Sequence, residues 1–514
     1  MSPHDEGPPV GTDSRELVRA ASVNLLGMLA KASRTLFTFF VTRVGGPAVF
    51  GLFTLATGVV EVVTRFSIFG MDKSLLKFVP EARREGGTRP YRLLSAAFLT
   101  SQALGLVVTL AVVVGAAWIS ETWLDTPELV WPLRLVALSI LPVTLMNLVL
   151  AATKALKIMS YDALVSGGLF PLSLLLFSLP ILWTEADIVA LAVAYALAGV
   201  AGVAVSLWLF RRHFSVKAAF TTAPGTALGE MVRFSTPLGL HDFILYLAMK
   251  VELFILAFFV QPAAVGVYAL AAELAFVLKK FRQIFDPILL PLMAEARGGG
   301  QMDRVEANLA RVIRWVLMLG VFYVTSMILF GPSILGLFGE EFTVGATVLV
   351  VLCLAQMANV ATGTLDLAMI VAGRPRINLL NISLILVAQT GLNLWLIPRY
   401  GIVGAGVAAL GAFVFIGLVR LGQSLFLLEL NPFRQAQLKP IAAGALAGLA
   451  LVAVGARMPL PDLPFGWVIG IVILGLVYLL LLRILGFEEE DADLLKRILP
   501  GRRGSVGEGG LGGG

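Results

Sequence analysis

The chain has 514 residues, of which 58% are hydrophobic and only 14% are charged. Soluble domains average roughly 45–50% apolar and 25% charged residues, so this chain carries more apolar surface than a soluble globule can bury. The mean hydropathy of +0.90 agrees, and we interpret the net charge of +6 as a signal of membrane topology rather than of nucleic-acid binding.

Apolar windows long enough to cross a bilayer recur along the whole chain. No alternation of apolar and polar residues runs through them, which argues against a β-barrel. They predict an all-α polytopic membrane protein with about fourteen transmembrane helices, near residues 20–43, 47–70, 92–119, 131–153, 161–183, 186–210, 235–260, 262–286, 308–330, 343–372, 376–398, 401–428, 439–457 and 465–485.

The ends of the chain and its single cysteine add three expectations. The first sixteen residues are polar and lack a cleavage pattern, so the first window is predicted to be an uncleaved span. The glycine-rich tail from Arg502 to Gly514 is expected to be disordered. Because Cys353 is the only cysteine and lies in a span, we expect no disulfide and no cysteine metal site. We also expect no cofactor.

The basic residues predict the orientation of the helices. If the N-terminus is inside, the inner loops contain most of the lysines and arginines, whereas outer loops carry acids such as Glu121, Asp125 and Glu128. Six tryptophans fall near outer helix ends, as interfacial anchors do: Trp118, Trp123, Trp131, Trp183, Trp395 and Trp467. We therefore expect a multi-pass protein of the cytoplasmic membrane with both termini in the cytoplasm.

Part of the sequence occurs twice. Residues 47–51 read P-A-V-F-G and residues 262–266 read P-A-A-V-G, and each copy is followed by the tripeptide Glu-Ala-Arg, at Glu81 and Glu295. The copies begin at the second and eighth predicted helices, an even number of spans apart, so both cross the membrane in the same direction. This predicts two pseudo-symmetric six-helix halves related by an axis along the membrane normal.

The predicted organisation follows from this repeat and from the loops. It consists of a cytoplasmic segment (1–16), an N-terminal six-helix lobe (17–212), a cytoplasmic linker (213–232), a C-terminal six-helix lobe (233–429), helices 13 and 14 (430–486) and a flexible cytoplasmic tail (487–514).

Four stretches resemble a known family. They are F-G-L-F-T-L-A at 50–56, G-M-D-K at 70–73, F-V-P-E-A-R-R at 78–84 and I-P-R-Y-G-I-V-G-A at 397–405. The chain is similar, from about residue 17 to 485, to the polysaccharide-repeat (O-antigen type) flippases. These belong to the multidrug/oligosaccharidyl-lipid/polysaccharide exporter superfamily, together with the lipid II flippase and multidrug–cation antiporters. The resemblance implies two six-helix lobes that form a V and alternate access, often with two extra C-terminal helices.

Ionisable residues within the predicted spans concentrate on helices 1, 2, 7 and 8. Each such charge is costly in hydrocarbon unless it is paired or lies in a wet cavity. A flippase for lipid-linked sugars must move a diphosphate across the membrane, and this anion needs cations along its path. We therefore predict a cationic substrate-binding cavity formed by Lys31, Arg34, Arg65 and Lys250.

Two other interpretations of these charges remain open. The cations could pair within the protein, Arg65 with Glu61 on the same helix and Lys250 with Glu273 on the next. Asp242 and Glu273 are also candidates for proton or sodium coupling, because an isolated carboxylic acid in a low-dielectric medium holds its proton at neutral pH.

The repeated Glu-Ala-Arg segments follow helices 2 and 8 on the predicted cytoplasmic side. Glu81, Arg83, Glu295 and Arg297 are predicted to brace a cytoplasmic gate through ion pairs that form when it closes. The alternative is that these residues are solvated helix ends.

The functional prediction is a transporter, not an enzyme. It would translocate polyprenyl-pyrophosphate-linked oligosaccharide repeat units, with membrane lipids and the polymerase and chain-length machinery as partners. A cation-coupled drug antiporter or a lipid II flippase of the same superfamily is the alternative; helix 1 carries cations, which favours an anionic cargo. A membrane polymerase is less favoured because the loops are short, and the chain has no GxxxxGK[ST] motif of an ATPase.

Overall fold

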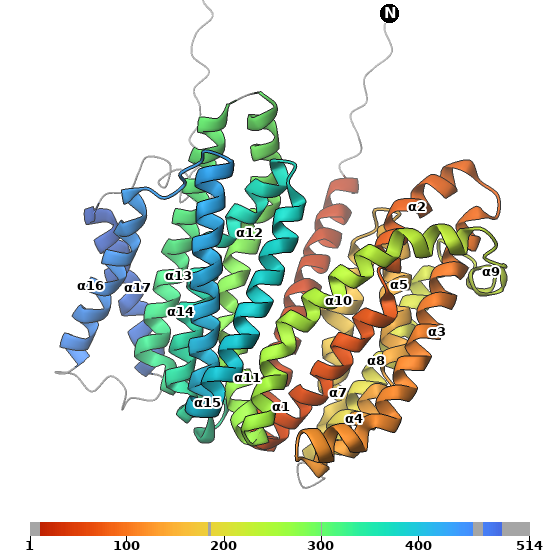
Figure 1. The fold of residues 1–514 in the computed structure, drawn as a ribbon, viewed down its shortest axis with the longest axis horizontal. Coiled ribbons are helices and arrows are strands. Elements are labelled where there is room, and N and C mark those ends of the chain that lie inside the picture. Colours follow the sequence, from red (N-terminus) through yellow and green to blue (C-terminus); the bar gives the residue numbers. More distant parts are fainter. Residues whose placement is uncertain (1–10, 183–186, 300, 456–465, 486–514) are drawn as a thin grey trace, which may run out of the picture. The chain divides into compact units, whose positions relative to one another are not determined.

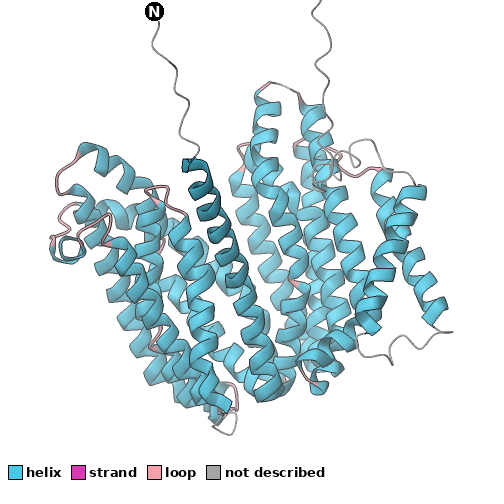
Figure 2. Ribbon diagram, turned by 180° about the vertical axis from the view of Figure 1, so that it is seen from behind, coloured by secondary structure: helices cyan, strands magenta, loops and turns pink. Residues whose placement is uncertain are grey.

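The computed structural model describes residues 11–182, 187–299, 301–455 and 466–485. Within these ranges every regular element is a helix and none is a strand (Figure 2). The predicted all-α polytopic membrane fold is therefore confirmed. The segments 1–10 and 486–514, which contain most of the predicted N-terminal segment and tail, lie outside the described residues.

The first helix is a pair of crossings joined without a loop. α1 runs from Gly11 to Ile68 but is broken at Gly46, whose backbone has φ 68° and ψ −174°. That conformation suits glycine, and Pro47 then starts the second half, where a missing N–H costs no helical hydrogen bond. The break separates the two windows predicted at 20–43 and 47–70.

The rest of the N-terminal half is a series of shorter helices. Asp187 caps one of them, because its Oδ1 accepts a hydrogen bond of 2.8 Å from the Val189 backbone N–H. The elements are α2 (Met71–Glu85), α3 (Arg89–Ala117), α4 (Val130–Ala137), α5 (Ile140–Lys154), α6 (Ser160–Leu164), α7 (Phe170–Ser178), α8 (Ile188–Phe210) and α9 (Val216–Thr221).

The C-terminal half contains longer helices. They are α10 (Ala227–Phe259), α11 (Pro262–Ala275), α12 (Val277–Gly298), α13 (Met302–Phe338), α14 (Ala346–Val371), α15 (Pro375–Leu427), α16 (Leu438–Gly455) and α17 (Gly466–Leu485). α15 contains a second break, at Gly401 with φ 55° and ψ −134°, three residues after Pro398. This break separates the windows predicted at 376–398 and 401–428.

Eleven helical stretches of the described residues are long and apolar enough to span a membrane. Two of them, Ser33–Glu85 and Arg376–Leu427, contain the breaks in α1 and α15 and so hold two crossings each. α10 adds another: its 33 residues exceed the ~20 that a span needs, although it carries several charged side chains. The count reaches the fourteen windows expected from the sequence.

The chain forms two compact units. One comprises Met1–Val277, Pro332–Ala358 and Pro375–Val419, and the other comprises Leu278–Gly331, Asn359–Arg374 and Arg420–Gly514. In the first unit, α3, α4, α5, α7 and α8 pack beside one another around α1 (Figure 1). A buried cluster that includes Met71, Leu93, Phe98 and Phe210 fixes α2 against this bundle.

In the second unit, α16 and α17 pack on α13 through small residues. A Cβ at Gly444 would overlap the Val321 side chain, and one at Gly470 would overlap the Phe330 ring. The Tyr478 hydroxyl donates a hydrogen bond of 3.0 Å to the Met318 carbonyl. Glycine at these positions therefore permits the close helix contacts that stabilise proteins in lipid, where apolar burial gives little driving force.

Candidate functional site

The two copies of the sequence repeat contact each other directly. A Cβ built on Gly51 would overlap the carbonyl oxygen of Pro262, and a Cβ built on Gly266 would overlap the carbonyl oxygen of Pro47. Pro47 and Gly51 correspond to Pro262 and Gly266 in the repeat. The contact between α1 and α11 is therefore reciprocal, as expected at a two-fold axis.

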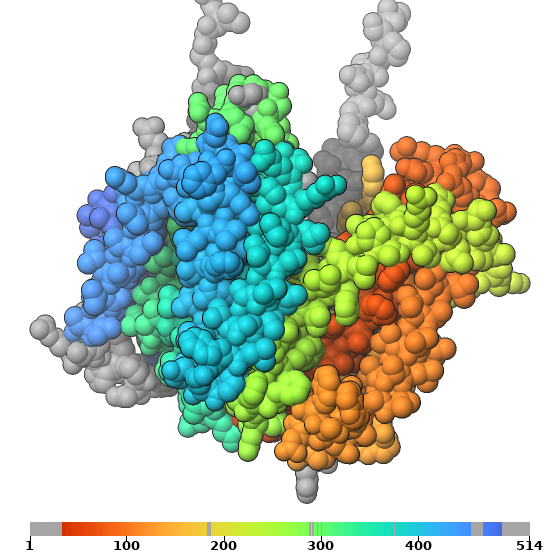
Figure 3. Space-filling model, in the orientation of Figure 1, coloured from red at the N-terminus to blue at the C-terminus, as the bar shows by residue number. Residues whose placement is uncertain are grey.

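From this crossing, the second half of α1 continues along α10, and we call the contact between them the α1–α10 seam. Gly58 faces the Leu253 side chain, the Phe66 and Phe243 rings meet edge to face with centroids 5.4 Å apart, and Gly70 meets Gly239. Residue numbers rise on one helix as they fall on the other, so the helices are antiparallel. The space-filling view shows α10, in yellow-green, lying across the orange surface of α1 to α3 (Figure 3).

An ion pair lies midway along the seam. The Lys250 ammonium nitrogen is 2.8 Å from Oε2 of Glu61, and the two side chains are 26% and 39% exposed. Each group therefore has its charge compensated inside a predicted span, as an intramembrane charge requires. Of the pairings left open by the sequence, Lys250 takes Glu61 rather than Glu273.

Arg65 lies one helical turn along from Glu61. Its guanidinium carbon is 4.4 Å from the centroid of the Tyr246 ring, within the range of a cation–π contact. The planar group is thus held by an aromatic face, and its N–H donors are not all consumed by a carboxylate. This arrangement keeps a positive charge beside the Glu61–Lys250 pair.

The first half of α1 provides another cation. Arg34 Nε lies 3.7 Å from Oε1 of Glu273 on α11, and the Thr38 hydroxyl donates a 3.3 Å hydrogen bond to Oε2. The Arg34 side chain is 75% exposed, so Glu273 and its neighbours do not enclose it. Lys31 belongs to the same helix, but its side chain lies outside the described residues.

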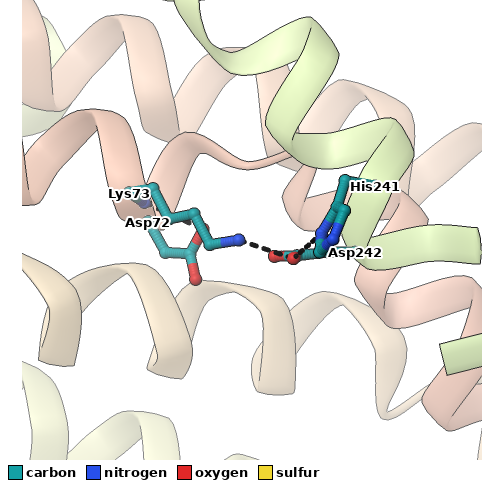
Figure 4. A network of polar contacts seen from close by, with 4 residues as sticks. All are labelled: Asp72, Lys73, His241 and Asp242. Atoms are coloured by element: carbon teal, nitrogen blue, oxygen red, sulfur yellow. Dashed lines mark hydrogen bonds and ion pairs between the residues drawn. The ribbon is translucent and has the colours of Figure 1, made fainter. Parts of the chain in front are cut away.

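A second ion pair closes the end of the seam that lies next to α2. The Lys73 ammonium lies 2.5 Å from Oδ1 of Asp242, which also lies 3.3 Å from Nδ1 of His241. Figure 4 shows Lys73 and His241 reaching this carboxylate from opposite sides, while Asp72 stands apart from it. Asp242, predicted as a possible coupling residue, is therefore engaged by two nitrogen groups.

The backbones of α2 and α10 approach closely at this end. Phe69 and Gly70 both have positive φ, at 52° and 71°, which turns the chain from α1 into α2. A Cβ on Gly70 would lie 2.7 Å from the Gly239 nitrogen and 2.8 Å from the Ser235 carbonyl oxygen. The hydroxyls of Ser74 and Ser235 are 2.6 Å apart. Small residues thus allow α2 and α10 to meet almost backbone to backbone.

Glu252, two residues beyond Lys250 on α10, is engaged elsewhere. Gln389 of α15 donates a hydrogen bond to its Oε2. Among described residues, no group of three or more histidines, cysteines, aspartates and glutamates is placed to hold a metal ion.

The predicted gate residues lie on the surface. Glu81, Arg83, Glu295 and Arg297 are all exposed, and the Arg83 guanidinium lies 5.2 Å from the centre of the Phe214 ring. Their role in a gate stays a prediction. The residues that close the seam next to α2 are Lys73 and Asp242, 169 positions apart, and no local pattern could have paired them.

A separate polar cluster lies within the second unit. Arg420 binds Asp366 through two contacts, Nε to Oδ1 at 2.9 Å and Nη2 to Oδ2 at 2.6 Å. Its Nη1 donates to Asn359 at 3.3 Å, and its side chain is only 10% exposed. A bidentate arginine–carboxylate pair between α14 and α15 thus fixes these helices. The only signal of this cluster in the sequence is the presence of an acid and a base in spans.

Comparison with solved structures shows the same fold in transporters. The chain is similar to the lipid II flippase MurJ in an inward closed conformation, with TM-score 0.76 and 14% identity over 92% of this chain and 100% of that one. It is also similar to an inward-facing multidrug resistance MATE transporter of the MOP superfamily (TM-score 0.58, 16% identity, 77% and 92% coverage). A MOP superfamily transporter from Pyrococcus furiosus matches with TM-score 0.54 and 15% identity over 78% and 93% of the two chains.

No curated protein sequence matches the chain. The family model described as polysaccharide biosynthesis protein matches residues 17–296, which is more than half of the chain and includes the whole α1–α10 seam and its ion pairs. The chain belongs to this family, and its fold is that of the MurJ flippase and the MATE transporter.

Proposed function

We propose that this protein is a flippase that moves polyprenyl-pyrophosphate-linked oligosaccharide repeat units across the cytoplasmic membrane for cell-surface polysaccharide synthesis. The observation that carries the proposal is the set of cations on α1 and α10: Arg34, Arg65 and Lys250 lie within predicted spans, and none of the three side chains is fully buried. The family match and the transporter fold support the same conclusion.

The chemistry of the cargo fits these cations. A diphosphate needs compensating charge at every point of its path, which arginine supplies through paired hydrogen bonds and lysine as a mobile point charge. The polyprenyl chain stays in the lipid while only the head group crosses. The two halves alternate access, with the membrane potential or a coupling ion as the driving force. Both termini lie in the cytoplasm, and the polymerase and chain-length machinery receive the product.

Accumulation of lipid-linked repeat units in a deletion strain, sorted by membrane face, tests this function. Repeat units trapped on the cytoplasmic face, and released when the wild-type gene returns, would establish the flippase and identify the sugar. Accumulation of lipid II instead would identify the protein as a lipid II flippase. No accumulation of either lipid, with increased sensitivity to cationic drugs, would indicate a drug antiporter.

Reversing the charge of Arg34 should abolish transport without loss of membrane insertion. Arg34→Glu places a second acid beside Glu273 and removes a hydrogen-bond donor to the phosphate. One charge-assisted hydrogen bond contributes roughly 1.5–3 kcal/mol, which is at least about tenfold in affinity. We expect the same of Lys31→Glu, while Arg34→Lys keeps part of the activity. Complementation of the deletion strain, with protein levels checked by blotting, is the measurement. Full activity of both glutamate variants would contradict the cationic path.

A disulfide across the end of the seam next to α2 should stop transport reversibly. The Ser74 and Ser235 hydroxyls are 2.6 Å apart, so cysteines at both positions are placed to bond upon oxidation. Alternating access requires α2 and α10 to separate here, and the bond would prevent it. We expect Ser74→Cys/Ser235→Cys, in a Cys353→Ala background, to lose activity under oxidant and regain it with reductant. Each single cysteine variant is the control, and transport by the cross-linked protein would show that the seam does not open.

A further inference from the structure

We propose that Glu61 is an internal counter-ion which the diphosphate of the cargo displaces from Lys250. This inference rests on the proposed function and deepens it, since it names the group with which the cargo must compete. In the empty transporter Glu61 occupies the place of the anion on Lys250, and in the loaded transporter the diphosphate takes that place.

The geometry of the pair supports exchange. The carboxylate and the ammonium are 2.8 Å apart, yet 39% of the Glu61 side chain and 26% of the Lys250 side chain remain exposed. Neither side chain is enclosed on all sides, so the pair has an accessible side. An incoming anion therefore reaches the lysine without first unfolding the seam.

The two residues also come from different halves of the internal repeat. Glu61 follows the Pro47–Gly51 stretch on α1, and Lys250 lies on α10, just before the Pro262–Gly266 stretch. The pair therefore links the two halves close to their reciprocal contact. An unpaired ammonium in a span is costly. The return of Glu61 after release lets the empty transporter change conformation without exposing a bare charge to hydrocarbon.

A second cation makes the displaced state favourable. Arg65 is four residues from Glu61 on the same face of α1, and its guanidinium is positioned by the Tyr246 ring at 4.4 Å. With Glu61 in place, the local group of three has one net positive charge. When Glu61 moves aside, the diphosphate meets two positive charges instead of one, so attraction for the anion rises as the carboxylate departs.

Binding of farnesyl diphosphate, a short polyprenyl diphosphate, to the purified full-length protein tests the proposal. Glu61→Gln frees Lys250 without changing size, so we expect binding about tenfold tighter than wild type and transport that falls because release slows. Lys250→Gln should bind about tenfold more weakly. In Glu61→Gln/Lys250→Gln the gain from the first substitution should vanish, since its effect passes through the lysine.

The controls separate this inference from the proposed function. Glu85→Gln removes the acid of another ion pair, 2.5 Å from Arg89 at the start of α3, and should bind like wild type. Glu61→Asp keeps the charge, should bind no more tightly than wild type, and serves if the glutamine variant fails to fold. Wild-type protein that binds no diphosphate would overturn the proposed function. Wild-type binding with equal affinity in Glu61→Gln would overturn only the counter-ion role.

Discussion

Alanine at Gly51 or at Gly266 should destabilise the protein more than any other single methyl group added to the first unit. The new Cβ would overlap a backbone carbonyl, of Pro262 or of Pro47, and a helix backbone cannot move aside as a flexible side chain can. Overpacking typically costs roughly 1–3 kcal/mol, and we expect about 3 kcal/mol or more here because α1 and α11 must separate. Thermal unfolding of the purified protein in detergent is the measurement, alongside complementation.

Matched glycines in helix interiors provide the control. Gly391 and Gly422 lie in α15, and a methyl group added at either position would meet no atom within 4 Å. Alanine at either should be neutral or stabilising by up to about 1 kcal/mol, since alanine favours helix over glycine. The double variant Gly51→Ala/Gly266→Ala should cost less than the sum of its singles, because one separation of the helices relieves both overlaps. Equal melting temperatures of Gly51→Ala and Gly391→Ala would show that α1 and α11 are not tightly packed where they cross.

Removing either partner of the Asp366–Arg420 pair should produce the largest loss of stability in the second unit. Asp366→Asn or Arg420→Gln leaves one charge buried without its bidentate partner, and such single removals cost roughly 3–5 kcal/mol. Replacing both residues by apolar side chains, as in Asp366→Leu/Arg420→Met, should recover most of the loss, since neither member of the pair is then left charged without the other.

The comparison pair is exposed and belongs to the same unit. Arg434 lies 3.5 Å from Glu306 with 54% of its side chain exposed, so Arg434→Gln should cost no more than about 1 kcal/mol. Thermal unfolding of all four variants in one detergent gives the ranking. If Asp366→Asn unfolds at the same temperature as Arg434→Gln, the buried pair does not hold α14 to α15.

The membrane architecture could be predicted because hydropathy and helix breakers act locally. Apolar windows identify spans, and the positions of Gly46, Pro47 and Gly401 identify the breaks that the structure places inside α1 and α15. The internal repeat is also visible in the sequence. That its two copies pack on each other is not, since the face that a helix presents to a distant helix depends on the tertiary structure.

The charged residues show the same division. Arg34, Arg65 and Lys250 stand out in the sequence because ionisable groups in spans are rare. Their partners do not, because the antiparallel register of α1 and α10 brings Glu61 to Lys250, and the turn into α2 brings Lys73 to Asp242. A rotation of either helix about its axis by one residue would change every ion-pair partner across the seam. No local sequence pattern reports that rotation. In the sequence Lys73 is one basic loop residue among many.

The reciprocal contact of Gly51 with Pro262 and of Gly266 with Pro47 has a consequence for the origin of the chain. Two separate half-length polypeptides, each with one copy of the proline–glycine stretch, would form the same self-complementary interface as a parallel homodimer. Gene fusion of such a dimer preserves the contact and frees every other position to diverge. Both sides of that interface carry a base–acid pair: Lys250 of α10 lies 2.8 Å from Glu61 of α1, and Arg34 of α1 lies 3.7 Å from Glu273 of α11.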